Sequence, residues 1–266
     1  MAKYTPMMEQ YLKVKEENPG CLLMFRLGDF YELFFDDAIT ASKELELTLT
    51  GRDCGQADRA PMCGVPYHAI EGYLQKLVSK GYRVAICEQM EDPKLAQGLV
   101  KREVTRIVTP GTNINSEHVE EKRNNYIMSV NRTCDRLGIA ICDITTGEFF
   151  VTEFEEEDKF WDEVAKYRPS EIIINEENAG GIDIERLKKS YEIFVNLYGA
   201  HHFRLERCED VLKHHFHVHS MEGLGMSELP LSVTAAGALL DYLVETQKRD
   251  LSHISRISTY SLKQYM

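Results

Sequence analysis

The stretch at residues 21–34 constrains the fold more tightly than any other part of the sequence. It opens with five consecutive apolar residues, at positions 21–25, and a short apolar run of this kind is typical of a buried strand. Gly28 and Asp29 then break the run, as the residues of a turn do. The sequence therefore predicts a rigid strand that ends in a turn, with the following residues presented at its exit.

Two interpretations of the residues after this turn remain open. Phe30, Leu33 and Phe34 are spaced as on one face of a helix, and a stripe of this kind is usually part of the core. If the backbone is extended instead, Phe30 and Glu32 lie on the same face of a strand. The ring of Phe30 is then presented outward, with a carboxylate beside it.

The rest of residues 1–109 alternates between helical and extended patterns. Residues 51–59 form a polar loop that contains two arginines, and residues 61–68 are typical of a rigid turn bounded by prolines. This part of the chain predicts a mixed α/β domain. We expect its helices at residues 6–17, 36–47 and 69–79, and its further strands at residues 82–89 and 102–108.

Residues 110–123 are polar and charged after a Pro-Gly break, which predicts a linker. Beyond it the strands come first, and helices and strands then alternate up to a long helix at residues 232–248, with Ser232 as its expected cap. This order predicts a three-layer α/β domain at residues 124–249. The pattern of residues 250–266 is broken and predicts the start of a further, truncated domain. The expected leading strands lie at residues 126–131, 137–143 and 148–153.

Composition and charge exclude several classes of protein. No run of 18 apolar residues occurs and the N-terminus lacks an apolar signal core, so we expect a cytoplasmic protein without a membrane span. The seven cysteines form no C-x-x-C pair, which favours reduced thiols over a disulfide framework or a zinc site. The net charge of −12 is uneven, with −2 in residues 1–110 and −10 in residues 111–266. We therefore expect other parts of a larger protein to supply most contacts with any nucleic-acid phosphates.

Three motifs indicate a family. GDFYELFFDDA at residues 28–38, MCGVPYHA at residues 62–69 and RIVTPGT at residues 106–112 resemble the MutS family of DNA mismatch-repair sensors. The resemblance covers essentially the whole chain, but it reaches only the family's first two domains and the start of its third. It implies a mixed α/β mismatch-recognition domain at residues 1–109, a ribonuclease-H-like connector domain at residues 124–249, and the first residues of the core or lever domain at 250–266.

The resemblance also implies roles for individual residues. Phe30 is expected to wedge into the duplex at a mispair or small loop, and Glu32 to form a hydrogen bond with the mispaired base, either as a protonated carboxyl or as a carboxylate that meets a base N–H. Insertion of a ring unstacks and bends the duplex, and the cost is lower where the pair is already mismatched. Leu27 is expected to add apolar contact in the groove. Arg52 either holds a phosphate or is an ordinary solvated charge.

Two other classes of function stay open. In a metal-dependent nuclease with a ribonuclease-H-like sheet, Asp143 at the end of a strand would be the first metal-binding carboxylate. A protein-interaction module is the second alternative, as in family members that bind no mispairs, although the joint presence of Phe30 and Glu32 argues against it. The further acids that such a nuclease could use are Glu148, Glu153, Glu171, Asp183 and Glu209.

Two clusters of basic residues have competing interpretations. Residues 101, 102 and 106 are Lys, Arg and Arg, and they form either a phosphate-facing strand or ordinary surface charge. Histidines at positions 214, 215, 217 and 219 include three at alternate positions, which would share one face of a strand and could bind zinc or nickel. No cysteine or acid is spaced to complete such a site, so we expect no metal there.

Cofactors and partners follow from the same resemblance. The phosphate-binding motif G-x-x-x-x-G-K-[ST] is absent from the sequence, so we expect this chain to hold no cofactor and to be no enzyme. ATP and magnesium are expected in the intact protein, outside this chain. The implied partners are mismatched double-stranded DNA and, through the connector domain, a MutL-type protein. The intact protein is expected to be a homodimer, this chain a monomer, and the location the bacterial cytoplasm in association with the nucleoid.

Overall fold

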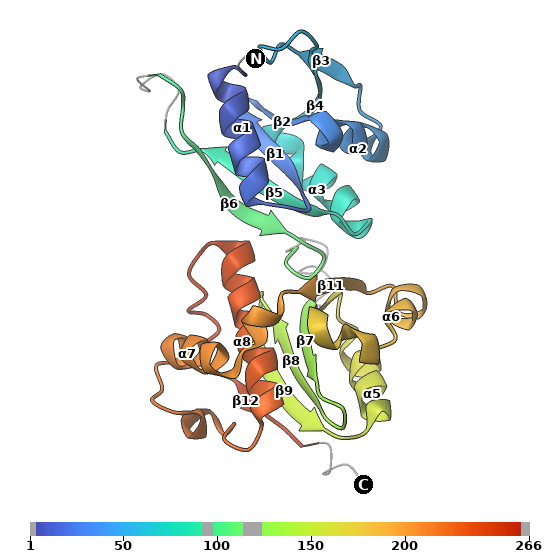
Figure 1. Cartoon of the computed structure of the whole chain (residues 1–266), viewed down its shortest axis with the longest axis vertical. Helices are drawn as coiled ribbons and strands as arrows, with labels where there is room; N and C mark the ends of the chain where they lie inside the picture. Colours follow the sequence, from blue (N-terminus) through green and yellow to red (C-terminus); the bar gives the residue numbers. More distant parts are fainter. Residues whose placement is uncertain (1–3, 92–97, 114–123, 262–266) are drawn as a thin grey trace. The chain divides into compact units, whose positions relative to one another are not determined.

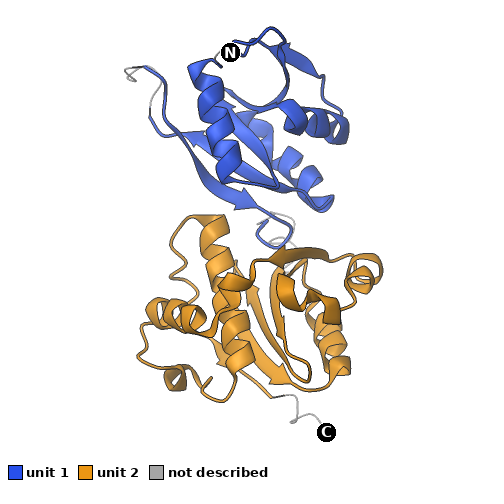
Figure 2. Ribbon diagram, in the orientation of Figure 1, with its two compact units in different colours: residues 1–113 blue, residues 114–266 orange. Residues whose placement is uncertain are grey.

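The computed structural model describes residues 4–91, 98–113 and 124–261, and the chain divides into two compact units. Unit 1 comprises residues 1–113 and unit 2 comprises residues 114–266 (Figure 2). Each unit contains a six-stranded sheet with helices on both faces, so the predicted α/β class is confirmed. Most of the expected linker, residues 114–123, lies outside the described residues.

The sheet of unit 1 is built from β1 (Cys21–Leu27), β2 (Phe30–Phe34), β3 (Thr50–Arg52), β4 (Ala60–Pro66), β5 (Arg83–Gln89) and β6 (Arg102–Val108). Their order across the sheet is β3-β4-β2-β1-β5-β6 (Figure 1). β1 and β5 run parallel, and the other neighbouring pairs described in this sheet are antiparallel. β1 therefore lies inside the sheet, with a partner on each side.

Three helices cover the two faces of this sheet: α1 (Pro6–Glu17), α2 (Phe35–Leu45) and α3 (Ile70–Ser79), the last preceded by the short 3-10 helix η1 (Tyr67–Ala69). α2 and α3 pack on one face, against residues such as Met24 and Leu33. α1 covers the other face, against Leu23 and Phe25. Burial on both faces explains why the sequence of β1 is continuously apolar rather than alternating.

The turn between β1 and β2 contains two residues, Gly28 and Asp29, so that Leu27 pairs with Phe30. Gly28 has a φ of +60°, which glycine adopts without steric cost. A positive φ at the first central residue alone is typical of a type II′ turn, whose twist matches that of antiparallel strands. The residues after the turn are extended, so the helical interpretation of residues 30–34 is wrong.

Unit 2 has its own sheet, with strand order β11-β10-β7-β8-β9-β12 (Figure 1). Its first three strands form an antiparallel meander, and β7, β10 and β11 then run parallel. This arrangement agrees with the expected ribonuclease-H-like order, in which a meander precedes alternating helices and strands. The strands are β7 (Tyr126–Arg132), β8 (Leu137–Asp143), β9 (Glu148–Phe154), β10 (Glu171–Asn175), β11 (Phe194–Tyr198) and β12 (Ser258–Thr259).

Helices on both faces of this second sheet complete the three layers. One face packs against α5 (Glu157–Tyr167) and α6 (Ile184–Ser190), and the other against α7 (Leu205–Phe216) and α8 (Pro230–Gln247). α8 lies along the sheet in Figure 1, and nearly all of its length is buried. Three short 3-10 helices connect these elements: η2 (Glu176–Gly181), η3 (Ala200–Phe203) and η4 (Met221–Leu224).

Two local predictions in unit 1 were wrong. The segment expected to be a proline-bounded turn is mostly strand β4, which pairs with β2 on one side and with β3 on the other. The expected polar loop contributes its first residues to β3, and Arg52 thereby joins the sheet. In both segments, hydrogen bonding to neighbouring strands outweighs the turn propensity of Gly and Pro.

One local prediction in unit 2 also differs from the structure. Ser232 is buried inside α8 and does not cap it, because the helix begins at Pro230 and the Glu153 carboxylate accepts hydrogen bonds from the N–H groups of Leu231 (3.0 Å) and Ser232 (3.2 Å). Residues 250–261 pack against unit 2, and the start of a further domain in residues 250–266 stays a prediction. Leu251 and Ile254 are buried in the core beside α7 and α8, and β12 extends the sheet. Residues 262–266 lie outside the described part of the chain.

Candidate nucleic-acid interface

Phe30 stands at the tip of the β1–β2 hairpin with 46% of its surface exposed. The next residue, Tyr31, is buried on the side of α2 and α3, and Phe34 is fully buried on the side of α1. Because alternate residues of a strand face opposite sides, Phe30 shares the α1 side with Phe34 but lies beyond the part that α1 covers. A large apolar ring is thus held in solvent on a rigid element.

Glu32 and Leu27 lie on the same face as Phe30. Glu32 follows Phe30 by two positions in β2, and the register places Leu27 directly opposite Phe30 on β1. Side chains of directly opposed residues lie on one face of a sheet. Leu27 is half-buried and packs at the edge of the α1-side core, so it can present only part of its surface. The structure therefore brings three of the four expected site residues together at one end of the sheet.

Arg52 is the fourth expected residue, and it reaches the same place from the edge strand β3. Its guanidinium forms a hydrogen-bonded ion pair with the carboxylate of Glu32, although β4 lies between their two strands. The side chain of Arg52 is 39% exposed and that of Glu32 is 16% exposed. Arg52 is therefore not simply a solvated loop charge, because its described partner is the carboxylate expected to meet the base.

A second group at the hairpin was missed from the sequence. The guanidinium of Arg26 lies 4.0 Å from the ring centroid of Tyr67, which is itself exposed, and 3.6 Å from the carboxylate of Glu88. The backbone N–H of Tyr67 donates to the carbonyl of Asp29 in the turn (2.9 Å). The hydroxyl of Tyr31 donates to Glu88, and burial, followed by this bond, raises the pKa of Tyr31 to about 12. These contacts brace the hairpin. In the sequence, the feature that could have indicated them is the tyrosine directly after Pro66.

The basic residues at positions 101, 102 and 106 each contact another group of unit 1. Arg102 is buried and donates to the carbonyl of Arg26 (2.8 Å) and to the amide oxygen of Gln10 (3.0 Å). Lys101 pairs with Glu103 at 2.6 Å, and Arg106 with Glu71 at 2.8 Å. Within the described residues each of the three cations thus already has a partner in the protein.

The acids of the nuclease alternative have structural roles in unit 2. Asp143 is fully buried, and its Oδ1 accepts hydrogen bonds from the backbone N–H (2.7 Å) and hydroxyl (2.6 Å) of Thr145 in the turn that follows β8. Glu153 caps α8, as described above, and Glu171 accepts a hydrogen bond from the hydroxyl of Tyr242 (2.5 Å). Asp183 caps α6 through the N–H of Arg186 (3.0 Å), Glu209 pairs with Lys213 at 2.8 Å, and Glu148 accepts from Tyr126 (2.9 Å).

The histidine pattern also has no support in the geometry. His214 and His215 belong to α7, and His217 ends that helix in a left-handed conformation, so the alternate positions do not share a strand face. His215 donates to the carbonyl of Ile254 (2.8 Å). Among the residues that the structure describes, no group of three or more His, Cys, Asp or Glu side chains is arranged to hold a metal ion.

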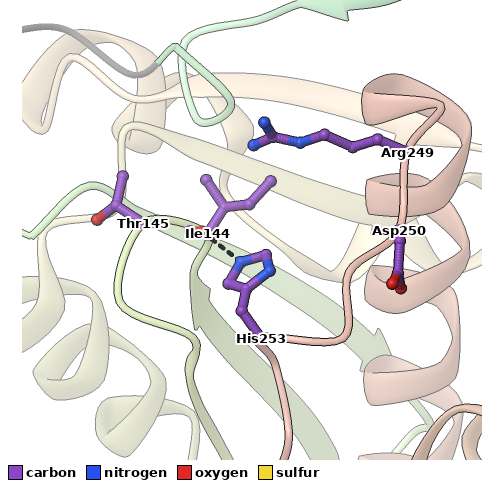
Figure 3. A pocket seen from close by; sticks show the side chains of 5 residues that line it. All are labelled: Ile144, Thr145, Arg249, Asp250 and His253. Carbon is purple, nitrogen blue, oxygen red and sulfur yellow. Dashed lines mark hydrogen bonds between the residues drawn. The ribbon is translucent and has the colours of Figure 1, made fainter.

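A shallow cavity of about 340 Å³ in unit 2 is lined by Ile144, Thr145, Arg249, Asp250 and His253 (Figure 3). The imidazole of His253 donates to the carbonyl of Ile144 (2.7 Å), and this bond ties the segment after α8 to the turn between β8 and β9. None of the expected site residues lies in this cavity.

No helix in the described part of the chain is long and apolar enough to cross a membrane.

Comparison with known proteins places both units in one family. The MutS domain I model matches residues 5–117, and the MutS domain II model matches residues 125–255. The DNA mismatch repair protein MutS of Lachnoclostridium phytofermentans is 55% identical over 267 residues, which cover all of this chain and 29% of that protein. The MutS proteins of Ruminiclostridium cellulolyticum and Acetivibrio thermocellus are 49% and 48% identical over 270 residues, again over all of this chain and 31% of each relative.

The chain spans about 30% of the length of these relatives. The two domain models match consecutive segments that correspond to the two structural units. Domain II extends in this match to residue 255, beyond the expected boundary at residue 249 and in agreement with the packing of Leu251 and Ile254. The chain belongs to the MutS family and contains its domains I and II.

Proposed function

We propose that this chain recognises mismatched duplex DNA, as part of a protein of DNA mismatch repair, and that Phe30 is the residue inserted at the mispair. The observation that carries the proposal is the exposure of the Phe30 ring at the tip of a braced hairpin, in a strand whose next aromatic residues are buried. The printed names of the relatives, DNA mismatch repair protein MutS, support it.

Insertion of a ring suits the detection of many different mispairs. An apolar wedge between two base steps unstacks them and kinks the duplex, at a cost of a few kcal/mol. Where the pair is already mismatched or unpaired this cost is lower, so the protein detects deformability instead of a particular sequence. Phenylalanine fits this role because its ring has a flat face and no polar tip to desolvate.

Glu32 supplies the second contact in this proposal. It shares the face of Phe30, and we propose that its carboxyl group forms a hydrogen bond with the displaced base. Leu27, opposite Phe30, adds apolar contact in the groove. A carboxylate repels the backbone of a regular duplex, so this contact favours sites where a base edge has become accessible.

The test compares binding to a duplex with a G·T mispair and to its matched twin, in a protein of the relatives' full length that contains this chain. Phe30→Ala is expected to lower the preference for the mispair by about tenfold or more, as expected when a stacking contact with a base is lost. Affinity for the matched duplex should change little. Fluorescence anisotropy titrations measure both affinities.

Ile39→Ala is the matched control, because Ile39 is an equally exposed apolar residue of unit 1 on α2, away from the hairpin. It should leave both affinities unchanged. A mispair preference that survives Phe30→Ala contradicts the proposal and directs the search for the recognising residue to other positions in unit 1.

The remaining partners belong to the longer protein. We propose that ATP and magnesium bind outside this chain, that unit 2 offers a surface to a MutL-type protein, and that the intact protein acts as a homodimer in the cytoplasm, at the nucleoid. The charge distribution supports this proposal, because residues 111–266 carry a net charge of −10 and residues 1–110 a net charge of only −2. Most phosphate contacts therefore come from other parts of the assembly.

A further inference from the structure

The ion pair between Glu32 and Arg52 joins two residues that the sequence separates by 20 positions. Arg52 lies on the edge strand β3, opposite Ala60 of β4, and Glu32 lies on β2, opposite Gly64 of β4. The guanidinium thus crosses the whole of β4 to reach the carboxylate. The Arg52 side chain stays partly exposed, but its head group is directed along the sheet toward Glu32 and not outward into solvent.

Gly64 leaves room for this arrangement. A Cβ atom at position 64 would lie 3.4 Å from Cγ of Glu32 and 3.2 Å from the carbonyl oxygen of Tyr31. The stem of Glu32 therefore lies against the backbone of β4 instead of against a side chain. With its stem supported by β4 and its head held by Arg52, Glu32 has little rotational freedom.

The ion pair with Arg52 uses only one of the two oxygens of the Glu32 carboxylate. Nη1 of Arg52 donates to Oε2 of Glu32. Within residues 4–91, 98–113 and 124–261, Oε1 has no hydrogen-bond partner. Each carboxylate oxygen can accept more than one hydrogen bond, so Oε1 remains able to accept from a donor that comes from outside the protein.

We propose that Arg52 is a positioning residue for Glu32: it holds Oε2, offsets the negative charge of the carboxylate, and leaves Oε1 directed at the N–H group of a displaced base. This inference rests on the proposed function of Phe30 and Glu32. It gives Arg52 a role in the discrimination between mispaired and paired DNA, in place of a role in affinity for the DNA backbone.

Charge compensation explains why an acid can be tolerated at this surface. An isolated carboxylate next to a DNA backbone is repelled by every phosphate nearby. A guanidinium in contact with it makes the pair neutral as a whole, and its half-buried position reduces the screening by water and salt that weakens exposed pairs. The oxygen that faces the base remains a strong acceptor, because hydrogen bonds to ionised groups are stronger than those to neutral ones.

The competing role for Arg52 is direct contact with a phosphate. A contact of that kind acts equally on matched and mismatched duplexes, and its loss lowers the slope of log affinity against log salt by about 0.9. A positioning residue acts only through Glu32, so its loss has no effect on binding once Glu32 is removed.

The experiment is a double-mutant cycle in a protein of the relatives' full length that contains this chain. Affinities for a G·T duplex and its matched twin are measured over a range of salt concentrations for wild type, Arg52→Met, Glu32→Ala and the double variant. Arg52→Met keeps most of the length of the side chain and removes its charge. Arg52→Lys keeps the charge but not the planar group, and should restore part of the preference.

The expected result is that Arg52→Met lowers the preference for the mispair by about fivefold or more, the effect of one charge-assisted hydrogen bond. In the Glu32→Ala background the same substitution should change neither affinity and leave the salt slope as it was. Arg59→Met is the matched control. It removes an exposed arginine from the same segment, one that does not pair with Glu32, and should leave the preference intact.

The inference is overturned if Arg52→Met weakens both duplexes in the Glu32→Ala background with a shallower salt slope, because Arg52 then contacts phosphate directly. A different result separates this failure from that of the proposed function: if Phe30→Ala and Glu32→Ala both keep the preference, the recognition site itself is misplaced. Urea unfolding of each variant shows whether β3 still forms, and Arg52→Lys gives the same decision if Arg52→Met is unfolded.

Discussion

Two phenylalanines of β2 show how position decides the role of a side chain. Phe30 and Phe34 lie on the same face of the same strand, yet Phe34 is fully buried and Phe30 is exposed. The ring centroid of Tyr11 on α1 lies 4.9 Å from that of Phe34, while α1 does not extend over the hairpin tip. Phe34 therefore contributes to the stability of the fold, and the ring of Phe30 is left for an external partner.

Asp37 shows the opposite case, a charge that serves the fold alone. It is buried at the start of α2, where its carboxylate pairs with the ammonium of Lys15 on α1 (2.7 Å) and accepts a hydrogen bond from the N–H of Leu23 on β1 (2.9 Å). The hydroxyl of Tyr11 is 3.3 Å away. One side chain thereby connects two helices and the central strand of unit 1.

Asp37→Ala should lower the free energy of unfolding of unit 1 by about 3 kcal/mol, because it leaves a half-buried ammonium and a buried N–H without their partner. Asp36→Ala is the matched control, since Asp36 is an exposed acid in the same first turn of α2. Its loss should cost less than about 1 kcal/mol. Urea unfolding followed by far-UV circular dichroism measures both values, and equal losses would show that the Asp37 network adds nothing to stability.

At this scale the sequence predicted the identity of the site residues better than their contacts. Phe30 and Glu32 came from a family resemblance, and their common face followed once the backbone was known to be extended. The pairing of Arg52 with Glu32 could not be predicted, because it depends on the order β3-β4-β2. Arg102, by contrast, carries a charge that the sequence alone suggested was exposed, and its burial depends on contacts more than 70 residues away.

Among the elements, the packing of α8 on β8 depends on one small residue. A Cβ atom at Gly138 would lie 2.2 Å from the carbonyl carbon of Leu231 and 2.5 Å from the nitrogen of Ser232, both in the first turn of α8. Glu153 caps this same turn from the neighbouring strand. The helix N-terminus thus lies directly on the backbone of the sheet, and only glycine at position 138 permits it.

Gly138→Ala should destabilise unit 2 by about 3 kcal/mol, because the added methyl group meets backbone atoms that cannot rotate away. Gly180→Ala is the control: it lies in η2, has no atom within 4 Å of the new methyl group, and should change stability by less than about 1 kcal/mol. Trp161, the sole tryptophan of the chain, is buried in unit 2 and reports its unfolding by fluorescence. An unchanged midpoint for Gly138→Ala would mean that α8 lies farther from β8.

Element prediction was successful where the hydrophobic pattern was uninterrupted, as in β1, which was expected as a buried strand, and in β8, whose observed bounds coincide with the expected ones. It failed for β4, which contains Pro61, Gly64 and Pro66. These residues disfavour a strand locally, but β4 lies between β2 and β3 and pairs along its whole length. Strand pairing of this kind depends on the assembled sheet, so it cannot be predicted from a short segment of the sequence.

At the scale of the whole molecule, several buried cysteine and tyrosine side chains in both units have raised pKa values. Burial is the largest cause in each case: it raises the pKa of Cys63 to about 11, that of Cys87 to about 12 and that of Cys208 to about 12. Burial also raises the pKa values of Tyr31 and Tyr126 to about 12. Both units therefore contain groups that resist ionisation in the folded state and ionise more readily when unfolded.

This shift predicts that the chain loses stability in alkaline solution. The ordinary pKa of a cysteine thiol is 9.0, so each raised thiol stabilises the fold fully below about pH 9, and this contribution is lost as the pH rises toward 11 or 12. At about pH 10.5 the loss from Cys63 and from Cys87 amounts to about 2 kcal/mol each. Urea unfolding at pH 8 and pH 10.5, followed by far-UV circular dichroism, should show a lower midpoint at the higher pH.

Cysteine variants separate this mechanism from general alkaline damage. Cys63→Ala removes a buried thiol, so its loss of stability between the two pH values should be smaller than that of the wild type by about 2 kcal/mol, even if it is less stable at pH 8. Cys134→Ala removes the exposed thiol in the turn between β7 and β8 and should show the same loss as the wild type. If Cys63→Ala also shows the full loss, the buried thiols do not set the alkaline limit, and ionisation of tyrosines such as Tyr31 must account for it.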